Sequence, residues 1–514
     1  MMRQAIGAAF GLALCMGGLP ALAVAASPAP AAAPQAPMQQ ADAAAPRRFE
    51  SLHKGRFNGK ALSYKALVEE HFITGPDGKR RASVFTTSYI ATGSGLAADR
   101  PVLFVFNGGP GSSSLWLHMG FVGPKRIDFG DVLKPRTVPP FRLIDNPQSP
   151  LDVADIVLID PPGTGFSTIL PGGQPEQFYG VTQDAAAVLD VMQQWVRGHN
   201  RWNAPKYLLS ESYGTVRAAA VAKLMAGGPL ATGHMDGMTL NGVILLGQSM
   251  NMERNEELAF ALDLPTLAAT ACHFGKVARP CTAAGQAAAA RAFIDESYAR
   301  ALIKGDALGE AERGALADRI AALTGLSRDY VLASNLRVGA RDFSRQLLAA
   351  EGKQTGLYDG RYTLPLSPSG GDPVADDPAM GQYVPAYVAT LNDYMRNDLG
   401  VRIDSGYEAI SFRQVNGRWD YGFGPGVPVG RNFAEDLAIA MRRNPHLRTM
   451  IGIGYYDLVT TLGAAEYMAT HSGLPAAAIE KRYYESGHMP YMGEGALAQL
   501  AQDVRRFVTA DGRP

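Results

Sequence analysis

A serine in a tight turn is the first feature of the sequence that suggests chemistry. The segment LLSESYGT, residues 208–215, places Ser212 shortly after an apolar run and two residues before Gly214. A serine in a sharp strand-to-helix turn presents its hydroxyl above a sheet, and the turn requires small neighbours, usually Gly-x-Ser-x-Gly. Ser210 replaces the first glycine, which is tolerable because serine is small. The pattern fits a nucleophile, although taken alone it fits a plain turn equally well.

A nucleophilic serine needs a general base, because its hydroxyl is a poor nucleophile at neutral pH. In α/β-hydrolases the chain order is serine, then an acid, then a histidine in a loop after the last strand. Of the nine histidines, His488 in ESGHMPY follows the last predicted strand within a small-residue loop. Asp457 follows the preceding predicted strand, residues 448–454, where it would orient the imidazole or cap a helix. We therefore predict a triad of Ser212, Asp457 and His488.

The oxyanion of such a reaction needs two backbone N–H donors, one from the residue after the nucleophile and one from a loop after an early strand. Tyr213 follows Ser212, and the glycine-rich segment NGGPGSSS, residues 107–114, supplies the loop. Glycine lets the main chain approach a ligand closely, so Gly109 is the predicted second donor. A phosphate-binding loop is the alternative, but the Lys-Ser/Thr of that motif is missing.

These residues must be held by a sheet, and the sequence predicts a parallel one. Continuous apolar runs precede the loops in PVLFVFNGGPGSSS, DIVLIDPPGTGFS, YLLSESYGT and GVILLGQS. Strands buried on both faces are typical of a parallel sheet, and the helices predicted between them, at 184–197 with Thr182 as N-cap and at 213–225, indicate a doubly wound α/β fold. Residues 66–74 and 82–92, joined by Gly-Pro-Asp-Gly, predict an antiparallel hairpin at one sheet edge.

The α/β rhythm stops near residue 250 and resumes near residue 432. The intervening segment is mostly helical and alanine-rich, so it is predicted to be an inserted cap. From the N-terminus, we expect a signal peptide at 1–25, a disordered Ala/Pro linker at 26–47, the first part of the core at 48–250, the cap at 251–431, and the second part of the core at 432–514.

Four segments in this order resemble the serine carboxypeptidase family, peptidase family S10: NGGPGSSS followed by Val-Gly-Pro, DPPGTGFS, SESYG, and the loops of Asp457 and His488. The resemblance implies an α/β-hydrolase fold with a mostly parallel sheet, and release of C-terminal residues from peptides through an acyl-enzyme. It also implies that Asn107, Gly108 and Glu211 bind the terminal carboxylate of the substrate. A protonated Glu211 would donate a hydrogen bond to that carboxylate, whereas an ionised one would repel it.

The sequence also departs from the family. By spacing, Phe121 stands where the family usually has a second acidic residue, and Ser112 stands where a cysteine is common. Thr-Val-Arg, residues 215–217, follows the ESYG motif, where the family often has a His-Tyr-Ile-Pro run. Arg217 could receive a terminal carboxylate, although a helix arginine more often forms a surface or interface salt bridge.

Two other functions remain open on the sequence. An esterase, acyltransferase or aminopeptidase would keep the triad and change the acyl substrate, and a non-catalytic binding protein would keep only the fold. The chain has 48 basic and 48 acidic residues, so nothing in its charge suggests a nucleic-acid partner. No metal-ligand spacing or dinucleotide fingerprint is present, so no metal or cofactor is expected, and the expected partners are peptide substrates.

The first 25 residues resemble an export signal, with Arg3, an apolar run too short to span a bilayer, and Ala-Val-Ala at residues 23–25. We expect a periplasmic or secreted protein with no membrane span after signal removal. Cys15 suggests lipidation, but the large Leu14 before it argues against this alternative. Cys272 and Cys281 remain after signal removal, and they are either bridged in an oxidising compartment or two buried thiols.

Overall fold

The computed structural model describes residues 45–93, 100–228, 230, 237–253, 256–367, 372, 374–427 and 429–510. The predicted signal peptide and nearly all of the predicted linker lie outside these residues. Residues 46–514 form one compact unit. The boundaries predicted at residues 250 and 431 within that unit stay predictions.

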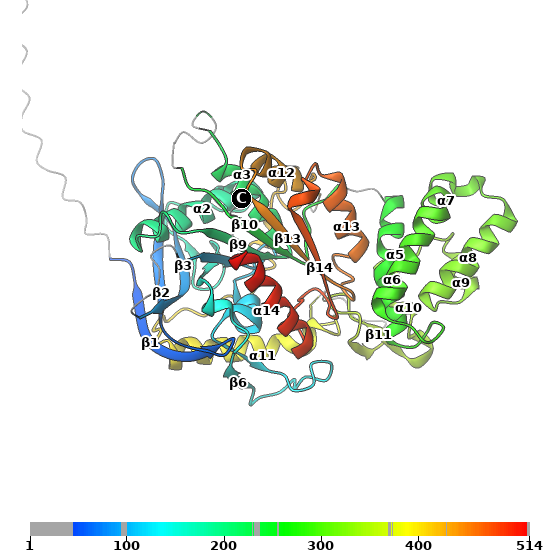
Figure 1. The fold of residues 1–514 in the computed structure, drawn as a ribbon, viewed down its shortest axis with the longest axis horizontal. Helices are drawn as coiled ribbons and strands as arrows, with labels where there is room; N and C mark the ends of the chain where they lie inside the picture. Colours follow the sequence, from blue (N-terminus) through cyan, green and yellow to red (C-terminus); the bar gives the residue numbers. More distant parts are fainter. Residues whose placement is uncertain are drawn as a thin grey trace, which may run out of the picture. The chain divides into compact units, whose positions relative to one another are not determined.

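A ten-stranded sheet forms the centre of this unit (Figure 1). Its order is β1-β2-β3-β7-β4-β9-β10-β13-β14, with β8 beside β3. The strands from β7 to β14 in this order are parallel, and the others are antiparallel, so the mostly parallel sheet is confirmed. The strands are β1 (Arg48–Phe57), β2 (Lys60–Thr74), β3 (Arg80–Thr92), β4 (Val102–Phe106), β7 (Asp155–Asp160), β8 (Thr168–Ile169), β9 (Lys206–Glu211), β10 (Gly242–Leu246), β13 (Arg448–Gly454) and β14 (Ile479–Tyr484).

Helices cover both faces of the sheet, which explains the continuous apolar strands. Every residue of β4, β7, β9 and β10 is buried. One face packs against α2 (Val181–Gly198), α3 (Gly214–Met225), α12 (Ala434–Arg443) and α13 (Leu462–His471). The other packs against α1 (Leu115–Leu117), α11 (Met380–Asp393) and α14 (Glu494–Thr509). Two hydrophobic cores therefore sandwich the sheet, as burial on both faces requires.

The predicted N-cap of α2 is wrong. The cap residue is Gly180, and Thr182 lies inside the helix. Gly180 forms an isolated bridge with Asp420, whose carbonyl accepts a hydrogen bond from the N–H of Val181. This tertiary contact fixes the start of the helix earlier than the local capping signal suggests.

The predicted hairpin is present as β2 and β3, both longer than expected, with the turn closed by a hydrogen bond from Gly78 to Gly75. Its predicted place at the sheet edge is wrong, because β1, which the sequence did not reveal, pairs with β2 along its full length and is the edge strand. Its side chains alternate between exposed and half-buried up to Phe57, so it has no apolar run. An edge strand of this kind carries a weak sequence signal.

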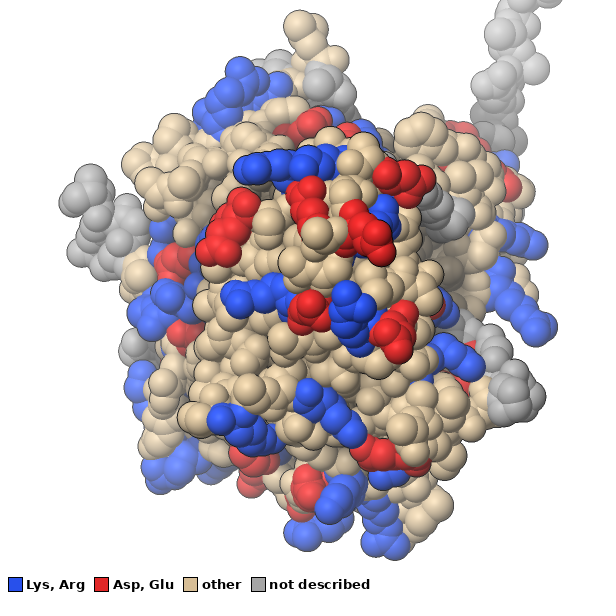
Figure 2. All heavy atoms as spheres, turned by 90° about the vertical axis from the view of Figure 1, so that its right-hand side faces the viewer, with Lys and Arg blue, Asp and Glu red and all other residues tan. Residues whose placement is uncertain are grey.

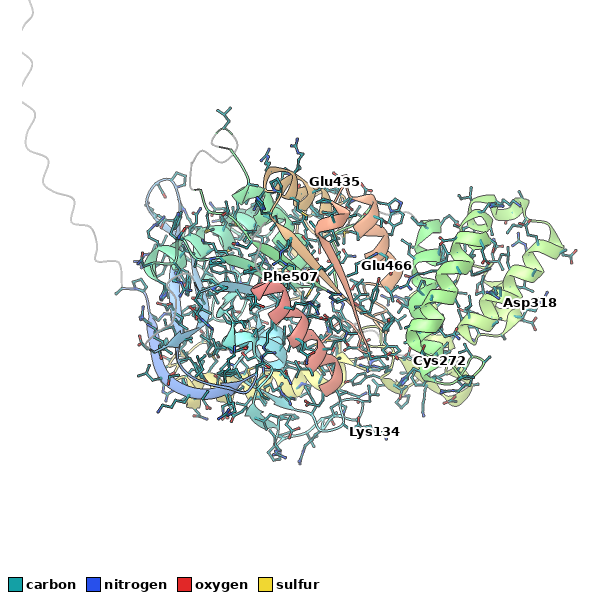
Figure 3. The ribbon with its side chains drawn as sticks, viewed as in Figure 1. Lys134, Cys272, Asp318, Glu435, Glu466 and Phe507 are labelled. Carbon is teal, nitrogen blue, oxygen red and sulfur yellow. A yellow bond between two sulfur atoms is a disulfide. The ribbon has the colours of Figure 1, made fainter. Side chains whose placement is uncertain are left out.

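Most of the predicted cap is helical, and its helices pack on a hydrophobic cluster of their own. They are α5 (Glu256–His273), α6 (Ala283–Phe293), α7 (Ala299–Lys304), α8 (Glu310–Thr324), α9 (Arg328–Ala333) and α10 (Ala340–Gln346). Cys272 at the end of α5 forms a disulfide with Cys281, which settles the alternative left open by the sequence (Figure 3). The face of the molecule shown in Figure 2 carries basic and acidic side chains interspersed with one another.

The remainder of the predicted cap returns to the sheet. α11 belongs to the same hydrophobic core as β4 and α14 and lies below the sheet in Figure 1. Two small antiparallel sheets lie outside the central one: β5 (Lys125–Asp128) with β6 (Arg142–Asp145), and β11 (Lys353–Thr355) with β12 (Thr363–Pro365). Within the described part of the chain, no helix is long and apolar enough to cross a membrane.

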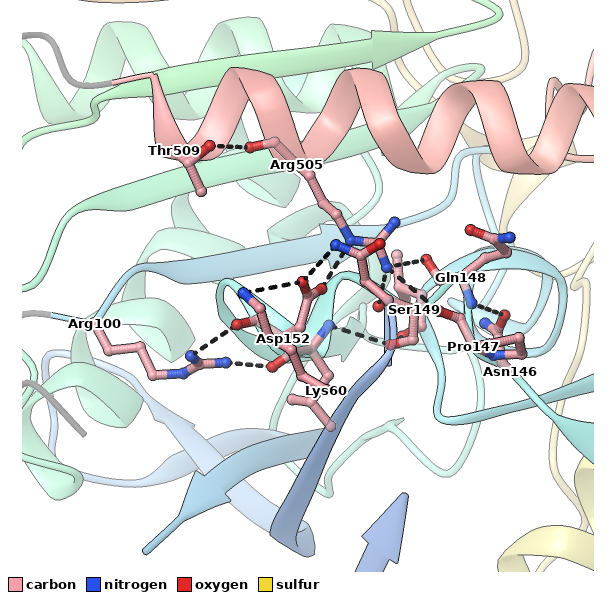
Figure 4. A network of polar contacts seen from close by, with 12 residues as sticks. Lys60, Arg100, Asn146, Pro147, Gln148, Ser149, Asp152, Arg505 and Thr509 are labelled. Atoms are coloured by element: carbon pink, nitrogen blue, oxygen red, sulfur yellow. Dashed lines mark hydrogen bonds and ion pairs between the residues drawn. The ribbon is translucent and has the colours of Figure 1, made fainter. Parts of the chain in front are cut away.

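A buried ion pair fastens α14 to the segment that precedes β7 (Figure 4). Arg505 Nε donates to Asp152 Oδ1 at 2.8 Å, and its Nη2 donates to the carbonyls of Gln148 and Ser149. The pair lies near the amino ends of the parallel strands. It therefore lies at the opposite end of these strands from the loops that follow them.

Candidate active site

Ser212 lies between the end of β9 and the start of α3, in the predicted turn. Its φ is +59°, a left-handed conformation that is uncommon for a residue with a side chain. Its N–H donates to the carbonyl of Leu246 on β10, and its carbonyl accepts from the N–H of Thr215 in α3. A serine held by both neighbouring elements in this strained backbone has the geometry of a nucleophile elbow.

Asp457 and His488 meet at the carboxyl ends of β13 and β14. His488 Nδ1 lies 2.8 Å from Asp457 Oδ2, and both residues are almost fully buried. Asp457 Oδ1 accepts from the N–H groups of Val459 and Thr460, and its Oδ2 also accepts from the Thr460 hydroxyl at 2.5 Å. These donors fix the carboxylate, and the carboxylate in turn fixes the imidazole tautomer. Thr460 is a part of this arrangement that the sequence reasoning missed.

The electrostatics of His488 suit a proton acceptor. Burial lowers the pKa of its imidazole, but the charge and hydrogen bond of Asp457, with a further contribution from Glu211, raise it above its ordinary value. Its Nε2 is buried and has no hydrogen-bond partner among the described residues. Gly247 leaves space for the ring, because a Cβ there would lie 3.0 Å from Nδ1 and Cε1 of His488.

Ser212 and His488 line the same cleft. No hydrogen bond joins the Ser212 hydroxyl to His488 Nε2 among the contacts of the described residues, and such bonds are often loose in unliganded sites. The other lining residues are the loop Asn107, Gly108 and Gly109, the polar Ser112 and Glu211, and the largely apolar Trp116, Tyr358, Met380, Ile410, Phe412 and Met489. A larger groove of about 1140 Å³ between α12 and α13 holds none of the predicted site residues.

The glycine-rich loop after β4 packs directly on the turn that holds Ser212. A Cβ on Gly108 would lie 2.4 Å from the backbone nitrogen of Tyr213, so only glycine fits there. Gly109 has a φ of +100°, which also requires glycine. The structure thus brings Gly109 and Tyr213, the two predicted N–H donors, into adjoining backbone segments beside Ser212.

Glu211 is buried between the loop and the histidine. Its Oε1 accepts from Asn107 Nδ2 at 2.9 Å, while its Oε2 has no hydrogen-bond partner in the described part of the chain. Burial raises the pKa of this carboxyl to about 7, and the charge of Asp457 adds to the rise. The charge of His488 opposes it, as does the nearby hydroxyl of Tyr491, although that hydroxyl makes no hydrogen bond of normal geometry with Glu211. Below neutral pH the group is therefore protonated and able to donate a hydrogen bond.

Two departures from the family pattern have structural explanations. Phe121 is buried in the core and stacks on Tyr491, with ring centroids 6.2 Å apart, and the hydroxyl of Tyr491 lies near enough to Glu211 to affect its pKa. Arg217 forms a salt bridge, with Asp184, but the pair is fully buried between α3 and α2, so a surface position is wrong for this arginine. It does not line the cleft either. Asp184 lies 33 residues earlier in the chain, and nothing in the sequence indicated this pairing.

Comparison with known proteins agrees with the motifs. Residues 85–264 match the serine carboxypeptidase family. A solved structure of Kex1(Δ)p, a prohormone-processing carboxypeptidase from Saccharomyces cerevisiae, is 14% identical, with a TM-score of 0.54 over 87% of this chain and 91% of that chain. No curated protein matches the chain significantly.

Other similar structures agree less closely. Proline iminopeptidase from Mycobacterium smegmatis is 14% identical over 86% of this chain and 99% of that chain, with a TM-score of 0.36. A thermophilic esterase from Thermogutta terrifontis is 14% identical over 86% and 98%, with a TM-score of 0.34. Scores this low support no inference by themselves. The family match and the fold together show a serine hydrolase of the α/β-hydrolase fold, whose residues 85–264 match the serine carboxypeptidase family.

Proposed function

We propose that the protein is a serine carboxypeptidase that removes C-terminal residues from peptides. One observation carries the proposal: a buried carboxyl group, Glu211, lies next to Ser212 with one oxygen held by Asn107 and the other without a partner. A protonated carboxyl facing the cleft suits a ligand that is itself a carboxylate.

In this proposal Ser212 is the nucleophile and His488 the general base. The Ser212 hydroxyl attacks the carbonyl of the last peptide bond, and its proton passes to His488 Nε2, which then gives it to the leaving amine. Asp457 stabilises the imidazolium that forms in between. The N–H groups of Gly109 and Tyr213 stabilise the oxyanion. In the second half of the reaction, water gives a proton to His488 and attacks the ester, and the Ser212 oxygen leaves and takes that proton back.

The terminal carboxylate of the substrate is held by the other half of the loop. Asn107, Gly108 and protonated Glu211 supply the hydrogen-bond donors for it, next to the scissile bond. Because the carboxylate is recognised at a fixed distance from Ser212, cleavage is confined to the last residue. An amidated C-terminus has no negative charge and is expected to bind poorly there.

A matched pair of substrates tests the proposal. A peptide with a free C-terminus and the same peptide amidated differ only in the carboxylate, and mass spectrometry of timed digests counts the residues removed from each. We expect stepwise shortening of the free-acid peptide and a value of kcat/KM for the amide lower by about two orders of magnitude, since a neutral amide loses charge-assisted hydrogen bonds worth about 1.5–3 kcal/mol. Equal cleavage of both peptides is incompatible with carboxypeptidase specificity.

A second candidate is a serine esterase of the same fold, and Phe121 favours it. Phe121 stacks on Tyr491 and supplies no carboxyl, so Glu211 is the one acidic group among the described residues that line the cleft. Carboxylate recognition with one acid would be weaker than with two. An ester panel with neutral and free-acid leaving groups separates the candidates, because an esterase would show no preference for the free acid.

Export to the periplasm or the cell exterior belongs to the same proposal. The Cys272–Cys281 disulfide supports it, because disulfides persist in oxidising compartments. Fractionation of cells that express the full chain, followed by measurement of its free thiols, tests this part independently of activity. A reduced protein confined to the cytoplasm contradicts export.

A further inference from the structure

Arg217 is a fully buried cation that the mechanism above does not use. It lies in the first turns of α3, the helix that begins just after Ser212, and its exposed fraction is 0%. A charge removed from water is costly unless it is paired and hydrogen-bonded. Its contacts therefore indicate which parts of the molecule it holds.

Those contacts reach the elements on both sides of the nucleophile. Arg217 Nη1 donates to the carbonyl of Asn107 at 2.5 Å, at the start of the glycine-rich loop. Its Nε donates to Asp184 Oδ2 at 2.7 Å, and the same oxygen accepts from the Tyr213 hydroxyl at 3.2 Å. The guanidinium also lies over the rings of Phe106 and Tyr213, 5.3 Å from each centroid. Asn107 lies two residues before Gly109, so one ion pair links both segments that carry the oxyanion donors.

The glycine-rich loop and the turn that holds Ser212 are closely packed against each other. A Cβ on Gly214 would lie 3.0 Å from the carbonyl oxygens of Asn107 and Phe106, and a Cβ on Gly108 would meet the Tyr213 nitrogen. In such close packing, a shift of the Asn107 carbonyl moves the glycine-rich loop relative to the elbow. Transition-state stabilisation by hydrogen bonds is sensitive to displacements of this kind.

We propose that Arg217 and Asp184 are positioning residues that fix the separation of the Gly109 and Tyr213 N–H groups, and so keep the oxyanion hole formed in the absence of substrate. The inference rests on the proposed roles of Ser212, Gly109 and Tyr213. Any buried ion pair affects the stability of the fold. The inference gives the Arg217–Asp184 pair a second role, in the reaction itself.

The test measures the second-order rate constant for labelling by a fluorophosphonate, whose P=O oxygen occupies the oxyanion hole. With the reagent in excess, molecules that are irreversibly unfolded lower the extent of labelling but not this constant. We expect Arg217→Met to lower it about 10- to 100-fold. On a free-acid peptide kcat/KM should fall by at least a similar factor, because the loop that Arg217 holds also carries Asn107 and Gly108, the proposed carboxylate donors. Arg217→Lys, which keeps the charge but cannot reach both partners, is expected to fall between Met and the wild type.

Arg505 supplies the matched control. It is also a buried arginine paired with an aspartate, but it lies at the other edge of the sheet (Figure 4). Arg505→Met should lower thermal stability as Arg217→Met does, and leave the labelling constant within about twofold of the wild type. An unchanged constant in Arg217→Met, or an equal loss in both variants, overturns the inference.

Two further variants keep the outcome decisive. If Arg217→Met does not fold, Arg217→Lys and Asp184→Asn carry the test, and unchanged labelling constants in these two overturn the inference equally. Ser212→Ala separates it from the proposed function. Labelling that survives in Ser212→Ala removes the proposed nucleophile itself, whereas loss of labelling there with normal constants in the Arg217 variants rejects the positioning role alone.

Discussion

Replacing Glu211 with glutamine should remove the alkaline limb of the pH profile on free-acid peptides. In the wild type, a carboxyl with a pKa of about 7 must be protonated to donate a hydrogen bond to the substrate carboxylate. Activity therefore falls as the pH rises through 7, because the ionised group repels the substrate. A glutamine amide donates at every pH and carries no charge, so its activity should not fall there.

The size of the effect follows from the pKa. About one tenth of Glu211 side chains are protonated at pH 8 and about one hundredth at pH 9, so wild-type kcat/KM should fall about tenfold for each pH unit above 7. At pH 9 the variant should retain most of its own plateau, whereas the wild type retains about one hundredth. At pH 5 the variant should be the slower enzyme, because an amide is a weaker donor than a carboxylic acid.

The assay measures kcat/KM from pH 4.5 to 9.5 for both proteins, on one free-acid peptide and on its amide. The acid limb, set by His488, should be the same in both proteins, since the raised pKa of His488 comes chiefly from Asp457. The amide serves as the control, because ionisation of Glu211 creates no repulsion with an uncharged terminus. An alkaline limb that stays at the same pH in Glu211→Gln would refute the role of this carboxyl.

Three further outcomes are expected. Asp457→Asn should lower kcat by about 10⁴-fold with little change in KM, measured on the free-acid peptide, because the imidazole loses the group that orients and stabilises it; a loss under about tenfold speaks against the assignment. The pKa of Glu211 is higher in the folded protein than its ordinary 4.5, so the folded state binds the extra proton between pH 4.5 and 7 and wild-type stability falls across that window. Urea unfolding should therefore show Glu211→Gln gaining up to about 3 kcal/mol on the wild type between pH 4.5 and 8, and a constant difference contradicts the raised pKa. Replacing Cys272 and Cys281, which are separated by 9 residues, with serine should cost about 2–3 kcal/mol of unfolding free energy and leave kcat/KM of the folded protein unchanged. The reduced wild type is the matching control, and its unfolding free energy should equal that of the double variant.

The parts of the fold that the sequence predicted well are those with strong local signals. Strand β13 has the predicted bounds, 448–454, because an apolar run between a helix and a loop leaves little choice. Helix α3 begins one residue after the predicted residue 213 and ends at the predicted residue 225. By contrast, β1 was missed, because it contains several charged residues and no apolar run. Its strand conformation comes from pairing with β2, which the local sequence does not reveal.

The candidate site shows the same division. Chain order and loop composition were enough to bring His488 and Asp457 forward as partners, and their side chains are 2.8 Å apart. The environment of Arg217 was not predictable, because an arginine in a helix is usually at the surface. Its burial depends on the packing of α2 beside α3, which brings Asp184 to it. The start of α2 was misplaced for a similar reason, since a backbone contact with a distant residue overrode the local signal.

The most direct measurement is the site of covalent labelling by a fluorophosphonate, read by mass spectrometry of the digested protein. One adduct is predicted, on Ser212, absent in Ser212→Ala and formed at least about 10³-fold more slowly in His488→Ala, since an unassisted hydroxyl is a poor nucleophile. An adduct on any other residue, or a labelling rate that does not depend on His488, would contradict activation of Ser212 by this histidine.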